Sequence, residues 1–286
     1  MQTLTPDTRV LIVGLGLIGG SYAKALTAKG YRVDAVTLEE TDLTAAREAG
    51  VIVRGATHPD PALLGEADLV IMALYPAATV EWLRENQRFL RAGTLITDTA
   101  GVKTPLIREI SLFLRPDLEF IGAHPMAGRE VSGYANSDPA IFRGANYIVV
   151  PTPENTPEAV EICRRLGEEL GFSRVSTLTP EEHDRTVGFV SQLTHCIAIA
   201  LMTCNTDDRL EDYTGDSFRD LTRIARINDA MWSELFLANR EALTEQFDAF
   251  IGEMQALRDK IAPERVEELR EQMRYATHRR ALFDKK

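Results

Sequence analysis

Short apolar runs alternate with longer amphipathic stretches over the first 178 residues of the chain. Strand-length apolar segments separated by helical patterns are typical of βαβ units, and they predict a mostly parallel sheet with helices on both faces. The expected strands are Val10–Val13, Val33–Thr37, Leu69–Leu74, Thr94–Thr97, Glu119–Gly122, Tyr147–Val150 and Arg174–Thr177. The amphipathic stretches between them include Ala77–Leu90, Thr104–Leu114 and Pro157–Leu170, and the prolines of Pro151–Pro157 predict a loop.

The pattern changes after Thr179-Pro180. From Glu181 to Arg280 the chain is almost entirely helical in period, with one proline and three glycines. Acidic residues directly after Pro180 suit the first turn of a helix, where negative charge meets the helix dipole. We therefore predict a domain boundary near residue 178, with an α/β domain over residues 1–178 and an all-α domain over residues 179–286.

The segment Val187–Met202 is apolar on most sides. A helix of that kind is usually buried, yet a helical region of about 100 residues offers little material to bury it within one chain. We therefore expect the all-α domain to be a dimerisation domain, in which helices of two identical chains pack together at the centre of a homodimer.

Composition and charge narrow the class of protein. The chain has 44% hydrophobic and 26% charged residues, which is ordinary for a globular protein. Its net charge of −11 disfavours nucleic acid as a partner, because phosphates need a basic face. We expect no apolar run to reach the ~20 residues that a membrane span needs, and we expect no signal peptide at the N-terminus. We expect a cytoplasmic protein with neither membrane nor metal, whose Cys163, Cys196 and Cys204 are free thiols.

The first expected strand runs directly into a glycine-rich turn. Gly14, Gly16 and Gly19 form G-x-G-x-x-G between that strand and a helical run from Ser21 to Ala28, which is the required context of the dinucleotide-binding fingerprint. The first glycine allows the tight turn, the second lets a pyrophosphate approach, and the third allows the helix to pack on the strand. The α/β domain is thus predicted to be a Rossmann-type, doubly wound domain, with Leu17 and Ile18 in the phosphate-binding turn.

The identity of the cofactor depends on the end of the second strand. An NAD site usually has an acidic residue there for the ribose hydroxyls, whereas this chain has Thr37. Without the acidic residue, nothing at this position repels the 2′-phosphate of NADP. However, acidic residues follow Thr37, and no arginine is near to bind that phosphate. We favour NAD and leave NADP open. Further cofactor-binding candidates lie where later strands end, at Leu74, Tyr75, Asp98 and Gly101.

Two polar segments follow the ends of expected strands, where reacting groups collect in an open parallel sheet. One is Asp98–Lys103 and the other is Ala123–Glu130. We expect His124 to lie on a loop that faces the crevice, because Pro125 follows it directly. Its ordinary pKa near neutrality suits a base that takes a proton from a hydroxyl. A purely structural loop histidine is the alternative.

Five segments, in order along the chain, resemble the prephenate and arogenate dehydrogenases. Gly122–Gly128 is similar to the family's G-x-H-P-M-x-G segment, and the turn at Gly14–Ser21 is similar to its nucleotide loop. Asp98–Lys103, Pro180–Asp184 and Phe218–Ala225, the last followed by Met231-Trp232, match three more family segments. The resemblance extends over nearly the whole chain.

The resemblance implies an oxidative decarboxylation in tyrosine biosynthesis. A hydride leaves C4 of prephenate for the nicotinamide, and loss of CO₂ gives 4-hydroxyphenylpyruvate. His124 is then the base for the 4-hydroxyl proton. The sequence does not decide between prephenate and arogenate. A β-hydroxyacid dehydrogenase is less favoured because Val187–Met202 lacks the lysine such enzymes use, and an NAD(H)-sensing module would not need His124.

The resemblance also implies a set of residues that bind the small anionic substrate. Arg223 is the expected carboxylate clamp, because a guanidinium binds a carboxylate through two hydrogen bonds. Arg219 lies four residues earlier and either assists it or pairs with Asp216 and Asp220. The remaining candidates are His195, Glu130, Trp232 and Lys103, of which Lys103 either steers the anion or caps its turn. His183 is expected to support packing or capping.

This chain departs from the family pattern at two further positions. Gly101 stands where many members have serine, so a hydroxyl contact from that position is missing. Gln192 stands where many have a second histidine, and an amide cannot become cationic. We expect neither the added regulatory domain nor the fused chorismate mutase that some family members carry, so tyrosine inhibition at the active site stays open.

Overall fold

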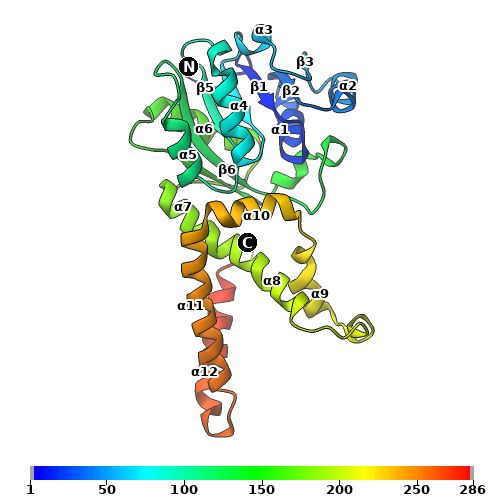
Figure 1. The fold of residues 1–286 in the computed structure, drawn as a ribbon, viewed down its shortest axis with the longest axis vertical. Helices are drawn as coiled ribbons and strands as arrows, with labels where there is room; N and C mark the ends of the chain where they lie inside the picture. The colour runs from blue at the N-terminus through cyan, green and yellow to red at the C-terminus, as the bar shows by residue number, and fades with distance from the viewer. Residues whose placement is uncertain (1–2, 284–286) are drawn as a thin grey trace.

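The computed structural model describes residues 3–283. The extreme ends of the two expected domains, residues 1–2 and 284–286, lie outside the described residues. A sheet flanked by helices forms one end of the molecule, and helices from residue 180 onward lie below it and extend into an arm (Figure 1). The α/β class and the all-helical second half are as predicted from the sequence.

Within the described residues, eight strands form one sheet in the order β3-β2-β1-β4-β5-β6-β7-β8. Neighbouring strands are parallel except β6 and β7, which pair antiparallel, so the prediction of a mostly parallel sheet is confirmed. The strands are β1 (Arg9–Val13), β2 (Arg32–Val36), β3 (Gly55–Ala56), β4 (Leu69–Met72), β5 (Leu95–Asp98), β6 (Glu119–Met126), β7 (Asn146–Val150) and β8 (Arg174–Thr177). β3 was not expected, because two residues show no periodicity.

Strand β6 corrects the expectation that His124 lies on a loop. The strand pairs parallel with β5 up to Ile121 and then antiparallel with β7 as far as Met126, so His124 is inside a strand and opposite Ile148. The change of partner leaves the β5 side of this second half as an open edge. Pro125 is tolerated there because proline lacks only the one N–H, and an open edge does not require it.

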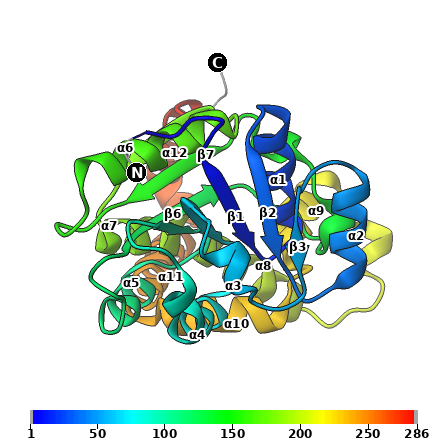
Figure 2. The same cartoon turned by 90° about the horizontal axis from the view of Figure 1, so that it is seen from above.

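Alternate residues of the strands build two cores, one on each face of the sheet. Val10 and Ile12 pack with Tyr22 and Leu26 of α1 on one face, whereas Leu11 and Val13 point to the other. Helices α1 (Leu17–Ala28), α2 (Glu40–Glu48) and α6 (Pro157–Glu169) contribute to the first core, and α3 (Pro61–Leu64), α4 (Pro76–Asn86) and α5 (Thr104–Ser111) to the second. Figure 2 shows α4 and α5 across the sheet from α6. Short 3₁₀ turns are η1 (Gln87–Phe89), η2 (Tyr134–Asn136) and η3 (Pro139–Phe142).

The helical half starts with a capping box. Thr179 accepts a hydrogen bond from the backbone N–H of Glu182, whose side chain accepts one from the backbone N–H of Thr179. From there α7 (Pro180–Val187), the π-helical turn η4 (Gly188–Leu193) and α8 (Thr194–Thr203) follow without a break. The later elements are η5 (Leu210–Tyr213), α9 (Asp216–Thr222), η6 (Arg223–Ala225), α10 (Asp229–Ala238), α11 (Arg240–Asp259), η7 (Pro263–Arg265) and α12 (Val266–Ala281). Helices α11 and α12 form the arm (Figure 1).

The continuous helix shows that the expectation of no apolar run as long as a membrane span was wrong. Because α7, η4 and α8 join, the helix Pro180–Thr203 has 24 residues and is, by length and composition only, long and apolar enough to cross a membrane. Only 28% of its most apolar window is buried within the chain. Its apolar side chains therefore lack cover in a single copy, which is also the character of a helix at the centre of an oligomer.

Candidate active site

The glycine turn between β1 and α1 has the geometry that a dinucleotide phosphate needs. Gly14 has φ of +97°, and a Cβ there would lie 2.6 Å from the carbonyl oxygen of Ala73. A Cβ on Gly19 would lie 1.9 Å from the carbonyl oxygen of Gly14, so both positions require glycine. At Gly16, by contrast, a Cβ would meet nothing within 4 Å. No side chain caps α1, so the N–H groups of its partly exposed first turn, with Leu17 and Ile18, are available to a phosphate.

Thr37 and Leu74 line the same turn. Thr37 Oγ1 accepts a hydrogen bond of 3.3 Å from the backbone N–H of Leu15, so the residue that replaces the usual acid also holds the glycine turn in place. A Leu74 methyl group lies 2.9 Å from the Cβ position of Gly14. Tyr75 precedes α4, and its hydroxyl accepts a hydrogen bond of 3.2 Å from the side-chain amide of Asn228 in the helical half. The edge of the predicted cofactor site is therefore a contact between the two halves.

Asp98 and Lys103 form a buried ion pair. Both side chains have 0% exposure, and Lys103 Nζ lies 2.6 Å from Asp98 Oδ2 and 2.6 Å from the carbonyl oxygen of Ala100. The Asp98 carboxylate also accepts hydrogen bonds from the backbone N–H groups of Ala100 and Ala123. These partners occupy the buried ammonium group, so the Lys103 side chain is not exposed to bind an anionic substrate. Asp98 likewise organises the ends of β5 and β6.

His124 is the start of a buried hydrogen-bonded chain. Its Nδ1 lies 2.9 Å from Nε2 of His183 in α7, and Nδ1 of His183 lies 2.7 Å from Oδ1 of Asp184. Asp184 also accepts hydrogen bonds of 2.8 Å from the backbone N–H groups of Lys103 and Thr104. His183 is fully buried, whereas His124 retains partial exposure. Three side chains from the two halves thus meet at one point.

The surroundings keep both imidazoles neutral. Burial, the neighbouring His183 and the Lys103 ammonium lower the pKa of His124 well below its ordinary value. Burial also lowers the pKa of His183, against the opposing effect of its hydrogen bond to Asp184. Burial alone would raise the pKa of Asp184, but hydrogen bonds from His183 and Thr104 hold it below the ordinary value. At neutral pH this series of hydrogen-bonded side chains therefore consists of the Asp184 carboxylate followed by the uncharged imidazoles of His183 and His124.

A second cluster joins the loop after β6 to the helical half. Arg223 Nη1 forms an ion pair with Glu130 Oε1, and the guanidinium is more than half exposed. The rings of His195 and Trp232 stack with centroids 3.7 Å apart, and His195 Nδ1 lies 2.9 Å from the carbonyl oxygen of Ser191. Burial lowers the pKa of His195, with opposed smaller effects from Glu130 and Arg223. The structure therefore brings these four predicted substrate residues together.

Arg219 is oriented differently from Arg223. Its guanidinium pairs with Asp216 at 3.1 Å and donates to the carbonyl oxygen of Thr214 at 2.8 Å. These contacts match the structural alternative considered for Arg219, and the described contacts connect it to none of the other predicted site residues.

Gly101 and Gln192, two of the positions that depart from the family pattern, have different surroundings. A Cβ on Gly101 would lie 3.4 Å from the methyl groups of Leu235 and 3.9 Å from Cε1 of His124, so a small side chain could fit there. Gln192 is buried in η4, and its Oε1 accepts a hydrogen bond of 2.7 Å from the side-chain amide of Asn239. The same amide donates to the backbone carbonyl of Asp184 at 2.8 Å. Asn239 thus links Gln192 in η4 to Asp184 in α7.

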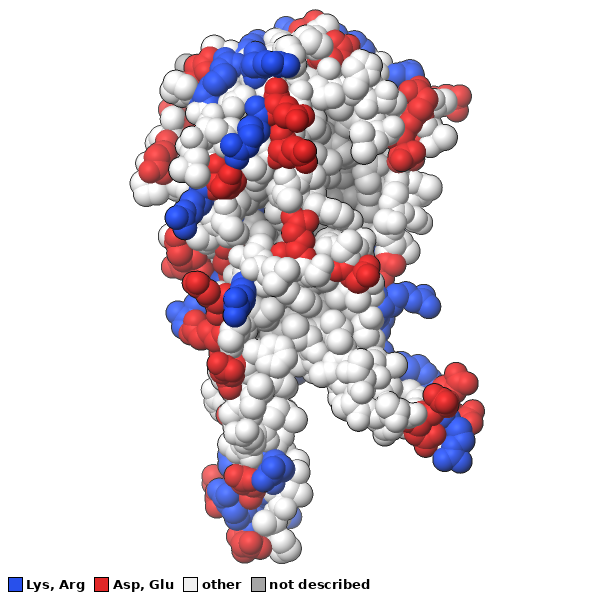
Figure 3. All heavy atoms as spheres, in the orientation of Figure 1, with Lys and Arg blue, Asp and Glu red and all other residues white. Residues whose placement is uncertain are grey.

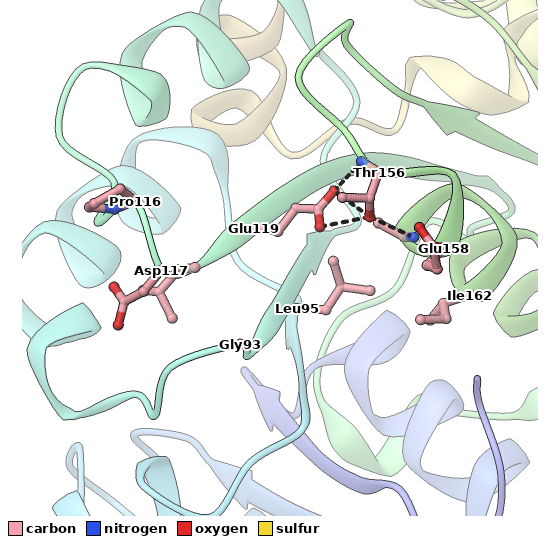
Figure 4. A pocket seen from close by; sticks show the side chains of 10 residues that line it. Gly93, Leu95, Pro116, Asp117, Glu119, Thr156, Glu158 and Ile162 are labelled. Carbon is pink, nitrogen blue, oxygen red and sulfur yellow. Dashed lines mark hydrogen bonds between the residues drawn. The ribbon is translucent and has the colours of Figure 1, made fainter. Parts of the chain in front are cut away.

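A separate hollow lies at the other end of the sheet, where β5 and β6 begin (Figure 4). Its lining includes Leu95, Glu119, Thr156 and Ile162, and none of the predicted site residues. Thr156 donates two hydrogen bonds to Glu119, through its backbone N–H at 2.7 Å and through its hydroxyl at 3.0 Å. The Glu119 carboxylate is therefore held by structural contacts.

Sequence reasoning missed the contact of His183 with His124 and the support from Asn239. The only local signal was the His183-Asp184 pair just after an acidic helix start, which also fits helix capping. The contact between the two imidazoles spans 59 positions along the chain, so no local pattern could reveal it.

Comparisons with family models, curated relatives and solved structures all match this chain to prephenate dehydrogenases. Residues 22–176 match the family model described as prephenate dehydrogenase, nucleotide-binding domain, and residues 179–275 match prephenate dehydrogenase, dimerization domain. A prephenate dehydrogenase of Bacillus subtilis is 32% identical over 91% of this chain and 72% of that protein. One of Lactococcus lactis is 30% identical over 88% of this chain and 71% of that protein. A crystal structure of prephenate dehydrogenase from A. aeolicus, in complex with hydroxyphenyl propionate and NAD⁺, superimposes with a TM-score of 0.88 at 29% identity, covering 98% of this chain and 99% of that one.

Proposed function

The chain belongs to the prephenate dehydrogenase family, and we propose that it converts prephenate to 4-hydroxyphenylpyruvate by oxidative decarboxylation, with NAD as the cofactor. Three observations support this proposal: His124 is hydrogen-bonded to the helical half, Arg223 pairs with Glu130 on the loop after the same strand, and the helix after the glycine turn starts without a side-chain cap. Bound NAD supplies the acceptor for the hydride from C4 of the substrate. The residues of the chain bind the substrate, orient it and remove its hydroxyl proton.

The residues of the glycine turn fit NAD. We propose that the backbone of Gly16, Leu17 and Ile18 holds the pyrophosphate, because the turn is open in front of Gly16 and the start of α1 carries no cap. Thr37 and Leu74 line the adjoining space, and Tyr75 and Gly101 lie at its border with the helical half. Comparing kcat/KM for the two nucleotides tests the choice, and a tenfold preference for NADP would overturn it.

His124 is proposed as the general base. Because its pKa is held well below the ordinary value, the imidazole is uncharged at neutral pH and can accept the proton of the 4-hydroxyl group. Removing that proton while the hydride departs avoids a build-up of positive charge on C4. Loss of the ring carboxylate as CO₂ then makes the ring aromatic, so the protein needs chiefly to orient the substrate.

Arg223 is proposed as the clamp for a substrate carboxylate. Its guanidinium is exposed and paired with a single carboxylate, Glu130, which a substrate carboxylate can replace. An exposed ion pair of this kind contributes little to stability, so the exchange costs little. His195 and Trp232 provide a stacked wall beside it. Arg219, Lys103 and Asp98 are proposed to maintain the site without touching substrate.

We also propose a division into domains of residues 1–178 and 179–286 and a homodimer built on the second. The dimerization-domain match and the sparsely buried helix Pro180–Thr203 support this assembly. Figure 3 shows a largely uncharged surface around α8. A cytoplasmic location is proposed because Cys163, Cys196 and Cys204 are all free thiols.

A spectrophotometric assay tests the proposed function. The purified protein is incubated with NAD and either prephenate or arogenate, and reduced nicotinamide is followed by its absorbance. We expect a higher kcat/KM with prephenate. Arogenate differs only by an amino group in place of the side-chain keto group, so a reversed preference would identify an arogenate dehydrogenase. Absence of turnover with either substrate would refute the proposal.

A further inference from the structure

Asp184 determines which group donates and which accepts in each hydrogen bond that links it through His183 to His124. Its carboxylate is ionised, because hydrogen bonds hold its pKa below the ordinary value, and an ionised carboxylate only accepts. Oδ1 and Oδ2 receive the backbone N–H groups of Lys103 and Thr104 at 2.8 Å. The contact of 2.7 Å between Oδ1 and His183 Nδ1 therefore requires the proton to be on Nδ1.

This assignment propagates to the next imidazole. A neutral histidine carries one ring proton, so His183 with a proton on Nδ1 has a bare Nε2. That nitrogen lies 2.9 Å from Nδ1 of His124 and can only accept. His124 must then carry its own proton on Nδ1, which leaves its Nε2 bare. A bare nitrogen is the form that a general base needs.

We propose that His183, held by Asp184, is the positioning residue that fixes the tautomer and ring orientation of His124 so that Nε2 is the catalytic base. The proposal deepens the function proposed above and rests on the role of His124 in it. When His124 accepts a proton at Nε2, its Nδ1–H continues to donate to His183. The new positive charge then lies at the end of a chain anchored by the Asp184 carboxylate.

The charged groups around His183 agree with this role. Asp184 lies on the same helix, and Lys103 and Asp98 face it from the turn between β5 and α5. Lys103 is neutralised by Asp98 at 2.6 Å, so the carboxylate of Asp184 remains free to orient His183. The side-chain amide of Asn239 donates to the backbone carbonyl of Asp184 in α7 and to Oε1 of Gln192. His183 and Asp184 come from the helical domain, so the base is correctly oriented only when the two domains are in contact.

The tautomer is measured directly by NMR on protein with ¹⁵N-labelled histidine. The chain has five histidines, so the imidazole spectrum is sparse and single substitutions assign it. In the substrate-free protein at neutral pH, we expect His124 and His183 both to carry their proton on Nδ1. A proton on Nε2 of His124 would overturn the proposal. This measurement needs no substrate, so it is independent of whether the proposed reaction occurs.

Kinetics of two variants provide the second test. His183→Leu removes the acceptor, and we expect kcat to fall by between about 10-fold and 10⁴-fold, as when a base loses the group that sets its tautomer, with KM and NAD affinity unchanged. His183→Gln places an amide oxygen near the lost Nε2 and should recover part of the loss. His278→Leu, at an exposed position in α12, is the matched control.

Two kinetic outcomes would contradict the proposal. One is a His183→Leu variant with unchanged kcat, and the other is a His183→Gln variant that folds but is no better than His183→Leu. If His183→Leu fails to fold, the tautomer of the wild-type protein and the kcat of His183→Gln still decide. Failure of wild-type turnover with prephenate would instead refute the proposed function and leave the tautomer measurement standing.

Discussion

Oδ2 of Asp184 lies 2.8 Å from the backbone nitrogen of Thr104, so a carboxylate of the helical domain caps the first turn of α5 in the nucleotide-binding domain. The other carboxylate oxygen, Oδ1, accepts hydrogen bonds from the backbone N–H of Lys103 and from the ring N–H of His183. One side chain therefore satisfies a helix N-terminus, joins two domains and orients the imidazoles. Damage to this contact should affect stability and catalysis together.

Replacing Asp184 with alanine should destabilise the protein by roughly 2–4 kcal/mol. The variant loses a helix cap and leaves a buried imidazole N–H unpaired, and each effect costs about 1–2 kcal/mol. Urea unfolding measures the change in the free energy of unfolding. Asp60→Ala is the matched control, because Asp60 caps α3 by accepting one hydrogen bond from the backbone N–H of Ala62 at an exposed site. A loss at Asp184 no larger than at Asp60 would contradict the bridging role.

Replacing His124 with asparagine should lower kcat by roughly 10² to 10⁴. Asparagine retains a polar side chain but offers no nitrogen lone pair for the substrate proton. The affinity for NAD should be almost unchanged, because the glycine turn follows β1 whereas His124 lies in β6. Steady-state kinetics and a nucleotide titration measure the two effects, with His58→Asn at an exposed position as the control. An unimpaired variant would remove His124 from the mechanism.

Replacing Arg223 with glutamine should raise KM for prephenate by about 10- to 100-fold. A hydrogen bond to a charged group contributes about 1.5–3 kcal/mol, and each 1.4 kcal/mol corresponds to a factor of ten. Arg219→Gln is the matched control, since its guanidinium is engaged by Asp216 and Thr214. Equal effects of the two substitutions on KM would show that the clamp lies elsewhere.

The features that the sequence predicted correctly depend on local patterns. The glycine turn follows from the spacing of its glycines and from its place between a strand and a helix; close backbone contacts require glycine at positions 14 and 19, and the space in front of Gly16 is open. Strand and helix alternation follows from hydrophobic periodicity. The candidate base was found from its immediate neighbours, although its place inside β6 was not, because the continuation of that strand depends on β7 as a new partner.

The features that were missed depend on contacts between distant residues or on burial. Lys103 is fully buried against Asp98, whereas lysine side chains are usually exposed, so its sequence position gave no reason to expect this. His183 looked like a capping residue because its partner His124 is 59 positions away. The joined length of α7, η4 and α8 was underestimated because charged residues at its start interrupt the apolar pattern.

Stability should decrease as the pH falls below about 6.5, the ordinary histidine pKa. The pKa values of His124 and His183 are lower in the folded protein, so below 6.5 the unfolded chain binds protons that the folded protein excludes. Their contribution is complete above 6.5 and is lost at up to about 1.4 kcal/mol per pH unit for each imidazole. Urea unfolding between pH 7.5 and 5.5 measures the slope. His183→Gln should flatten it, and an identical slope would contradict the pKa assignment.

Introducing a charge on the helix Pro180–Thr203 should dissociate the protein into monomers. Phe189 is 56% exposed in one copy of the chain, which is unusual for a phenylalanine in so apolar a helix. If a second copy covers it, Phe189→Asp buries an unpaired carboxylate at the interface, which costs several kcal/mol. Leu112→Asp is the matched control, because Leu112 is 74% exposed after α5 in the other domain.

Sedimentation velocity at micromolar concentration separates the outcomes of this experiment. We expect a dimer for the wild-type protein and for Leu112→Asp, and a monomer for Phe189→Asp. The helix η4–α8 also carries Gln192 and His195, so dissociation should reduce activity even though Phe189 makes no described contact with His124. A wild-type protein that sediments as a clean monomer would refute the dimer, and the exposed apolar face of Pro180–Thr203 would then need a different partner.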